Sequence, residues 1–488
     1  MLQEDERTAV DECEMPRDAD RGFLKTAWIV IVILVVVSVL LQGRENATRE
    51  ESVDALQRKV LDVQGQYLVA ASQLPGPQAS QLYENAAAFR NGPLFMRLRH
   101  VVLAGELVGA DEAIAQADAV AQYAAESSAT TTEREQAVLR ALRTLYSDYQ
   151  EDRWDAPSLE SSDRQLLKED LGWFGELALA PEQAERPDAA STRAEVLGGA
   201  GRTFAVVIVA TLLGLGVGLA GLIGAIVFLV LVLTRRIQSA MVTGLGDSAI
   251  YAETFAVWML LLFALSALAT LVVRRLPGYE ILVNSATPIL SLAALFWPTV
   301  RGVPWSRVRK DIGLYAGERP FGEILWGMVC YVSNLPLLMI GLLVTFALMG
   351  IHSAIAGGPG GLEPMETPTH PVVQWVQDAG WIGRLQIFTL ACLIAPLVEE
   401  TVFRGVLYRH LREGTCRWST SVSIALSAAI TSLIFAMIHP QGLLAIPALM
   451  AVAAGLSLTR EWRGSLLAPI AMHATNNGVL MLLLFSLV

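Results

Sequence analysis

The sequence is poor in the residues that build disulfide frameworks and cysteine-based metal sites. Its 488 residues include only four cysteines, at positions 13, 330, 392 and 416, and these have neither metal-binding nor redox spacing. None of the four falls between Gln42 and Arg202, where the chain is hydrophilic. That hydrophilic part is therefore held together without disulfides, and a cysteine-ligated metal or redox centre is excluded.

Charge is also scarce, and positive charge most of all. Only 17% of the residues are charged, the net charge is −11, and just four residues are lysine. The acidic surplus lies mostly outside the apolar segments. Because nucleic-acid binding needs basic surfaces, this balance gives no support to a nucleic-acid partner.

Apolar residues, in contrast, make up 53% of the chain. A mean hydropathy of +0.46 is too high for an ordinary soluble protein. We therefore predict an all-α, polytopic membrane helix bundle of about nine spans that contact the lipid bilayer. The predicted spans cover residues 27–41, 204–233, 252–273, 281–296, 324–350, 381–411, 421–438, 443–458 and 466–487.

A long hydrophilic region separates the first two spans. Within it, Glu51–Leu74, Glu112–Ser127 and Thr131–Tyr149 carry apolar residues at three and four spacing, which is typical of amphipathic helices. The spacing predicts an inserted α-helical domain, whose solvated surface is a possible place for a protein partner. The predicted organisation is a polar tail at 1–26, a signal-anchor span at 27–42, the hydrophilic domain at 43–202, membrane spans at 203–300 and a membrane domain at 301–488.

Loop charges predict the orientation. Residues 301–319 contain Arg307, Arg309 and Lys310, whereas the loop at 351–383 contains acidic residues but neither lysine nor arginine. By the positive-inside rule the first loop is cytoplasmic and the second external. Counting back places the N-terminus inside and the hydrophilic domain outside, in what we expect to be a bacterial cytoplasmic membrane.

The stretch from Trp381 to Leu411 carries the most informative charges. Glu399, Glu400 and Arg404 follow a run that is apolar enough to enter a bilayer, where ionised groups are costly. On a helix Glu400 and Arg404 share a face, while Glu399 is turned about 100° from Glu400. The arginine can thus neutralise one glutamate and leave the other to face something else. The alternative is a solvated helix end.

Two later apolar segments each supply a histidine. Phe435 and His439 are four residues apart, as are His473 and Asn477. A lone histidine in a hydrophobic helix usually makes a helix–helix hydrogen bond, and that remains the alternative for each. Two carboxylates, an arginine, two histidines and an asparagine on three segments instead suggest one polar cluster.

The segments EETVFR, FAMIH and HATNN resemble the motifs EExxxR, FxxxH and HxxxN. These motifs characterise the CAAX prenyl endopeptidase and bacteriocin-processing family of membrane proteases, also called CPBP or Abi. The similarity covers residues 385–484. It implies an intramembrane endopeptidase for membrane proteins or lipidated, CAAX-like peptides, in which Glu399 activates water and Glu400 and Arg404 support it. The site would be completed by His439, His473 and Asn477.

These residue types suit peptide hydrolysis. Burial makes a carboxylate a stronger base towards water, and Asn477 with a histidine can donate hydrogen bonds to an oxyanion. A zinc site of Glu399, His439 and His473 is the metal-dependent alternative, with Glu400 as the base. The sequence fits both schemes, and we favour the metal-free one.

Two other classes of function remain open. A non-catalytic membrane scaffold or bacteriocin-immunity protein could keep this fold and bind a partner through the hydrophilic domain. A transporter would place the buried charges along a pathway, but it predicts internal repeats, and the spans show none.

Overall fold

The structure is a computed structural model that describes residues 18–45, 50–75, 79–126, 132–243, 248–276, 278–317, 319–355, 372, 375–376 and 379–487. Helices are the only regular elements in these ranges, which confirms the predicted all-α class. Most of the predicted polar tail and most of the loop at 351–383 lie outside the described residues.

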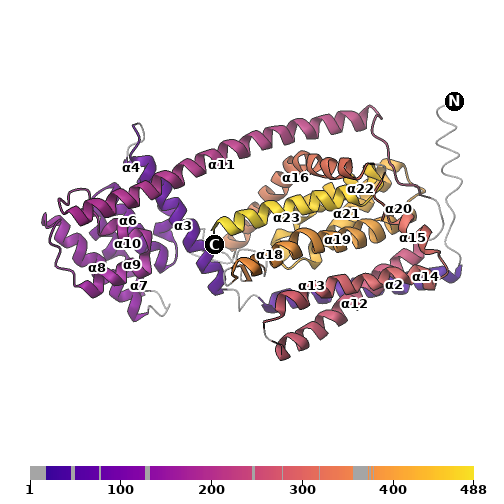
Figure 1. Ribbon diagram of the computed structural model, residues 1–488, viewed down its shortest axis with the longest axis horizontal. Helices are drawn as coiled ribbons and strands as arrows, with labels where there is room; N and C mark the ends of the chain where they lie inside the picture. Colours follow the sequence, from indigo (N-terminus) through magenta and orange to yellow (C-terminus); the bar gives the residue numbers. More distant parts are fainter. Residues whose placement is uncertain are drawn as a thin grey trace. The chain divides into compact units, whose positions relative to one another are not determined.

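The chain forms two compact units (Figure 1). One contains residues 1–52, 216–348 and 368–488, and the other residues 53–215 and 349–367. The first unit holds most of the apolar helices, and the second holds the helices of the hydrophilic region.

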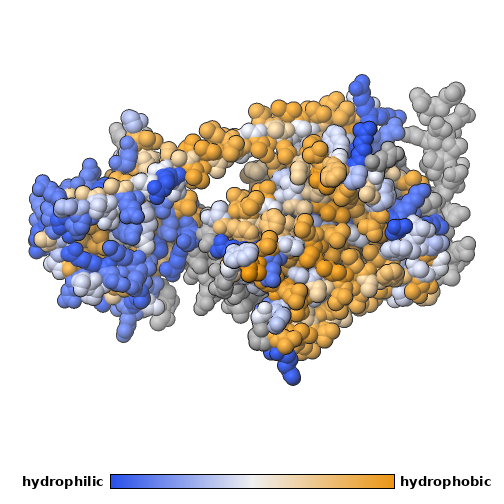
Figure 2. Space-filling view, in the orientation of Figure 1, coloured by the Kyte–Doolittle hydropathy of each residue, from blue (hydrophilic) through white to orange (hydrophobic). Residues whose placement is uncertain are grey.

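Nine helices within the described ranges are long and apolar enough to cross a membrane. This agrees with the predicted number of spans, and the protein is therefore a multi-pass membrane protein. Figure 2 shows hydrophobic residues over the helices of the first unit and hydrophilic residues over α6 to α10 of the second. The candidate spans are Gly22–Gln42, Pro187–Leu233, Ser248–Arg275, Glu280–Val300, Pro320–His352, Trp381–Gly414, Thr420–Ile438, Leu443–Arg463 and Leu467–Ser486.

The membrane unit packs its helices around buried aromatic and aliphatic side chains. Phe403, Phe255 and Trp258 contact one another edge to face or tilted, with ring centroids 5.4 to 5.7 Å apart. Its helices are α2 Asp18–Glu45, α12 Ser248–Arg275, α13 Glu280–Ser291, η2 Leu292–Phe296, α14 Trp297–Val300, α15 Trp305–Asp311, α16 Pro320–Ile355, α21 Thr420–Ile438, η5 Leu443–Ala445, α22 Ile446–Arg463 and α23 Leu467–Leu487.

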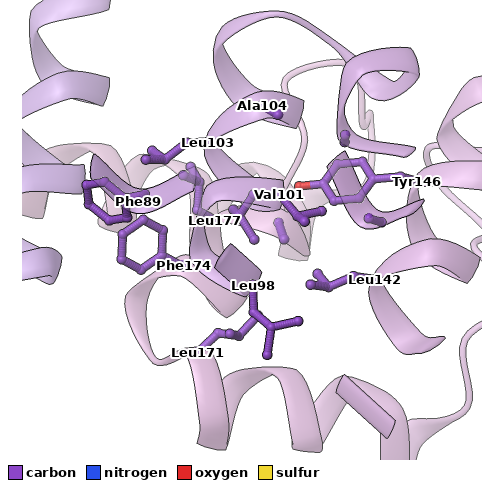
Figure 3. Close-up of a cluster of buried hydrophobic side chains, with 14 of the residues drawn as sticks. Phe89, Leu98, Val101, Leu103, Ala104, Leu142, Tyr146, Leu171, Phe174 and Leu177 are labelled. Carbon is purple, nitrogen blue, oxygen red and sulfur yellow. The ribbon is translucent and has the colours of Figure 1, made fainter. Parts of the chain in front are cut away.

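The hydrophilic unit has its own apolar core (Figure 3). Phe89 and Phe174 meet edge to face, with ring centroids 6.2 Å apart, and Leu142 and Leu98 are buried nearby. The helices are α3 Glu50–Ser72, α4 Ala79–Glu84, α5 Ala87–Asn91, α6 Leu94–Leu107, α7 Ala110–Glu126, α8 Glu133–Gln150, α9 Ser161–Leu171 and α10 Trp173–Ala178. These elements confirm the predicted α-helical insert.

Local sequence explains individual boundaries in this unit. Thr132 caps α8 by accepting a hydrogen bond from the Glu135 amide (3.2 Å) while the Glu135 carboxylate accepts one from the Thr132 amide (2.9 Å). This reciprocal arrangement satisfies two backbone donors at the first turn. Burial of apolar side chains along α8 then holds the helix against α7.

The second span begins much earlier than its apolar sequence suggests. Helix α11 is continuous from Pro187 to Leu233, so 47 residues of one helix include both polar and apolar sequence. The apolar part of α11 is rich in glycine between residues 214 and 224, and small residues of this kind favour close packing of helices in membranes. A Cβ atom on Gly221 or Gly224 would lie 2.4 Å from an atom of α16, so the two helices approach closely there. A Cβ atom on Gly214, Gly216 or Gly218 would have no neighbouring atom within 4 Å.

A buried polar network fixes one end of the helix that carries the glutamates. The Arg412 guanidinium donates to both carboxylate oxygens of Glu461 on α22, at 3.0 and 2.9 Å, and the Tyr408 hydroxyl donates to the same carboxylate at 2.8 Å. His410 accepts a hydrogen bond from the Trp28 indole of α2 at 3.2 Å. Because removing one member of such a network leaves its partner buried and unpaired, these contacts hold the helix firmly in register.

Candidate active site

Residues 381–414, which we call the glutamate helix, form one helix with two π-helical segments. Its parts are α18 Trp381–Thr389, η3 Leu390–Ile394, α19 Ala395–Glu399, η4 Glu400–Leu407 and α20 Tyr408–Gly414, of which η3 and η4 are π-helical. Glu399 ends α19 and Glu400 begins η4. π-Helical turns are rare and occur frequently at functional sites. Their positions here, one shortly before Glu399 and one beginning at Glu400, are therefore informative.

Proline contributes to this irregular geometry. Pro396 has no backbone N–H and so cannot donate to a carbonyl one turn earlier. The Ala395 amide donates to the Leu390 carbonyl, five residues back, which is the π-helical pattern. The sequence pattern does not reveal this, because the apolar residues of a π-helical segment read like those of an α-helix over so short a range.

Glu400 and Arg404 form the predicted pair and are both completely buried. A guanidinium nitrogen of Arg404 lies 3.0 Å from Glu400 Oε1, and each side chain has an exposed fraction of 0%. The other terminal nitrogen donates to the Ala453 carbonyl of α22 at 3.1 Å. A buried charge is stable only when it is paired and hydrogen-bonded, and this arginine provides that for Glu400.

Glu399 faces the two histidines instead. Its Oε2 atom lies 3.6 Å from Nε2 of His439 and 3.7 Å from Nε2 of His473. The Glu399 side chain is 26% exposed, whereas that of Glu400 is 0% exposed. The two adjacent carboxylates are therefore in different environments: Glu400 is held in a fully buried ion pair, whereas Glu399 is partly exposed and places its buried Oε2 atom between two imidazoles.

Hydrogen bonds on the far side of each ring determine what the histidines present to Glu399. His439 Nδ1 lies 2.6 Å from the Phe435 carbonyl, and His473 Nδ1 lies 2.8 Å from Glu400 Oε1. Both partners are acceptors, so each Nδ1 carries a hydrogen. In the neutral rings, Nε2 then directs a lone pair towards Glu399. A proton or a water molecule among these three atoms would satisfy them.

Asn477 lies one helical turn beyond His473 and makes a different contact. Its Nδ2 donates to the Ala391 carbonyl in η3 at 2.8 Å, and its Oδ1 accepts from Asn476 at 3.1 Å. The structure thus links Arg404, Glu400, His473, Glu399 and His439 in one chain of contacts, and joins Asn477 to the backbone of the glutamate helix. The alternative of a fully solvated EExxxR helix end does not fit the burial of Glu400 and Arg404.

The donor set of Glu399, His439 and His473 has the right chemistry for zinc, so its arrangement matters. In the part of the chain that the structure describes, no group of three or more His, Cys, Asp and Glu side chains is arranged to hold a metal ion. The zinc site of Glu399, His439 and His473 therefore stays a prediction.

The fold and the site together define a class: a multi-pass membrane protein with a carboxylate and two histidines gathered beside a buried ion pair. Residues 381–479 match the family model described as "Type II CAAX prenyl endopeptidase Rce1-like". This match confirms the resemblance drawn from the three motifs, and it begins at the start of the glutamate helix. It supports a CAAX-protease type of activity at a general level.

A comparison with curated proteins adds a second finding. The chain is 39% identical over 92 residues to an "Uncharacterized 24.3 kDa protein" of Escherichia coli. That match covers 18% of this chain and 40% of the relative's length. No solved structure shows a significant match to the chain.

Proposed function

We propose that this protein is an intramembrane endopeptidase that hydrolyses peptide bonds of membrane-associated or lipidated, CAAX-like substrates, with Glu399 as the general base. The observation that carries the proposal is the contrast between the two neighbouring carboxylates. Glu400 is fully buried in its ion pair with Arg404, whereas the side chain of Glu399 is partly exposed and its Oε2 atom, buried between two histidine Nε2 atoms, has no hydrogen-bond partner in the structure. A base must reach its substrate, and Glu399 is the accessible one.

The proposed reaction uses the proton of an attacking water. Glu399 takes a proton from a water molecule that lies against its carboxylate, and the water oxygen forms a bond with the carbonyl carbon of the substrate. The resulting oxyanion is stabilised by a donor N–H, which His439 or His473 supplies when its Nε2 is protonated. The proton on Glu399 then passes to the leaving nitrogen as the C–N bond breaks.

The remaining residues support this step. Arg404 neutralises Glu400, and Glu400 holds Nδ1 of His473, so the histidine is oriented by a buried carboxylate. A histidine fixed in this way keeps one tautomer and one ring direction. Orientation of this kind lowers the reorganisation needed during the reaction.

The substrate class and the orientation rest on the resemblance and on loop charges. A prenylated or otherwise membrane-anchored peptide would reach the site from the bilayer, with the N-terminus of the enzyme inside. The hydrophilic unit, which lies outside the matched residues 381–479, is a candidate surface for selecting that substrate or a protein partner.

The test is cleavage of a fluorogenic peptide library, with and without a farnesyl group, by purified protein in lipid nanodiscs. Glu399→Gln keeps the shape and removes the base, so we expect turnover to fall by about 10²-fold or more. The matched control is Glu323→Gln, which changes a glutamate of α16 that binds Arg463 away from the site. Equal turnover by Glu399→Gln and wild type would overturn the assignment.

A chelator arm separates the two chemical schemes. Activity that persists after chelation supports the glutamate mechanism, whereas activity that is lost and then restored by zinc supports the metal scheme. Absence of cleavage by the wild type across the whole library would favour the non-catalytic scaffold instead.

A further inference from the structure

One backbone carbonyl close to the site lacks its helical partner. In η3 the Ala395 amide donates to the Leu390 carbonyl, so hydrogen bonds there run from each residue to the fifth before it. The next bond in this pattern would run from residue 396 to Ala391. Residue 396 is a proline, which has no N–H to donate. The Ala391 carbonyl therefore does not receive the backbone hydrogen bond that continues this pattern.

A side chain from another helix fills this vacancy. Asn477 on α23 donates its amide to the Ala391 carbonyl at 2.8 Å. The orientation of that amide is fixed twice, because a carbonyl can only accept and because Asn476 donates to Asn477 Oδ1 at 3.1 Å. The bond therefore has an assigned donor and acceptor.

The two bonded groups lie beside the residues of the proposed reaction. Asn477 is one turn after His473 on α23, and Pro396 is three residues before Glu399 on the glutamate helix. His473 itself contacts both glutamates, at 3.7 and 2.8 Å. A shift of α23 along the glutamate helix would therefore have two effects at once: it would break the Asn477 contact and move His473 away from Glu399.

We propose that Asn477 is a positioning residue, whose amide replaces the backbone N–H that Pro396 lacks and so fixes the register of α23 against the glutamate helix. This role rests on the proposed function for its effect on catalysis, and it differs from the donation to the substrate oxyanion that we expected from the sequence. The hydrogen bond between Asn477 and Ala391 fixes the register of the two helices. That register in turn places His473 next to Glu399.

The proposal makes Pro396 and Asn477 interdependent. If Asn477 compensates for the missing N–H, then Pro396→Ala, which restores an N–H at that position, reduces the need for the asparagine. If Asn477 instead donates to the oxyanion, the residue at position 396 has no bearing on its loss.

The experiment is a double-mutant cycle of Asn477→Ala and Pro396→Ala in the full-length protein. The neighbouring control is Thr475→Ala, which removes a hydrogen bond within α23, from the Thr475 hydroxyl to the Ala471 carbonyl. The first readout is the thermal unfolding midpoint in detergent, which requires no substrate. We expect Asn477→Ala to lower the midpoint in the wild-type background and to lower it much less when residue 396 is alanine. Equal losses in both backgrounds would overturn the proposal, whether or not the protein is a protease.

The second readout is peptide cleavage. Because His473 is displaced, Asn477→Ala should have a lower kcat than the wild type, with little change in KM. Adding Pro396→Ala to this variant should raise its kcat at least tenfold. A different outcome is that the two substitutions are coupled in their effect on the unfolding midpoint while kcat of the double variant does not recover. That result would show that Asn477 acts on the substrate and would contradict a purely positioning role. If neither the wild type nor any variant cleaves a peptide, the proposed function is wrong. The unfolding midpoints still test the role of the Asn477 contact in that case.

A third variant does not depend on how the proline variant folds. Asn477→Asp keeps the shape of the side chain but places an acceptor against the Ala391 carbonyl, so its unfolding midpoint should lie below that of Asn477→Ala. A midpoint for Asn477→Asp at or above the Asn477→Ala value would contradict the proposed bond.

Discussion

The guanidinium carbon of Arg404 lies 4.7 Å from the ring centroid of Phe435, and the same ring lies 3.9 Å from that of His439. The phenylalanine of FAMIH thus contacts both the cation of the buried ion pair and one of the histidines that face Glu399. An aromatic ring beside a desolvated arginine contributes cation–π attraction in addition to packing. Phe435 therefore links the ion pair to the accessible part of the site.

Replacing this ring should affect catalysis more than stability. Phe435→Leu keeps an apolar side chain but removes the ring face from Arg404 and His439, so we expect a lower kcat. The matched control is Phe255→Leu, because Phe255 is also buried against Phe403 but belongs to α12. Both variants should lose about 1 kcal/mol of stability. A similar kcat in the two variants would remove the special role of Phe435.

Breaking the buried ion pair should be costly, and removing both charges should be less so. Arg404→Met leaves the Glu400 carboxylate buried without its partner, which typically costs about 3–5 kcal/mol. Adding Glu400→Gln removes the uncompensated charge and should restore part of the unfolding midpoint, measured in detergent. A single variant as stable as the wild type would show that the pair is solvated in lipid.

Close packing of α16 against α23 should also influence the site. A Cβ atom at Gly327 would lie 2.5 Å from the Ala468 carbonyl and 2.7 Å from the Ala471 side chain. Gly327→Ala therefore pushes on the helix that carries His473 and should cost about 1–3 kcal/mol, with a loss of cleavage. The control is Gly350→Ala on the same helix, where a Cβ atom would have no neighbouring atom within 4 Å. This variant should keep both its stability and its cleavage activity. Equal behaviour of the two variants would contradict the close contact.

The hydrophilic unit should lose stability as the pH falls. Burial lowers the pKa of His100 to about 4 from its ordinary value of 6.5, so the unfolded chain binds this proton more readily than the folded one. The contribution of neutral His100 is complete above pH 6.5 and is lost as the pH falls towards 4. Between pH 7 and pH 5 the loss amounts to about 2 kcal/mol.

Hydrogen-exchange protection of α6 in the full-length protein, corrected for intrinsic rates, measures this change. His100→Phe keeps an aromatic ring against Tyr83, whose ring centroid lies 5.1 Å away, and removes the titration. The variant should therefore show a flatter pH response than the wild type. Asp62 opposes the trend, because burial raises its pKa. An unchanged slope in His100→Phe would assign the effect to other groups.

Parts of the site could be predicted from sequence because they depend on local geometry. Glu400 and Arg404 are four residues apart on one helix, so their pairing follows from helical periodicity alone. The meeting of His439 and His473 at Glu399 depends on how α21 and α23 pack. Their spacing does not specify that packing. The polar residues shared by three apolar segments suggested a cluster, and the resemblance of the motifs suggested which residues meet in it.

The start of α11 and the π-helical segments could not be predicted from the sequence. Residues 187–202 are polar and show no apolar stripe that continues into the span, so the start of α11 at Pro187 was not predicted, although proline is common at the first helical position. The π-helical segments were missed because their lengths of five and eight residues are too short to shift the apolar period. The Asn477 contact depends on them and was hidden with them.

The π-helical segments also bear on insertions and deletions in related chains. A π-helical turn holds one residue more than an α-helical turn. Deletion of one residue between Gly405 and Leu407 would let η4 return to α-helical geometry, with both flanking segments kept nearly in place and the Glu400–Arg404 spacing intact. In an alignment, a one-residue gap at this point would therefore mark a change of helix type rather than the loss of the span.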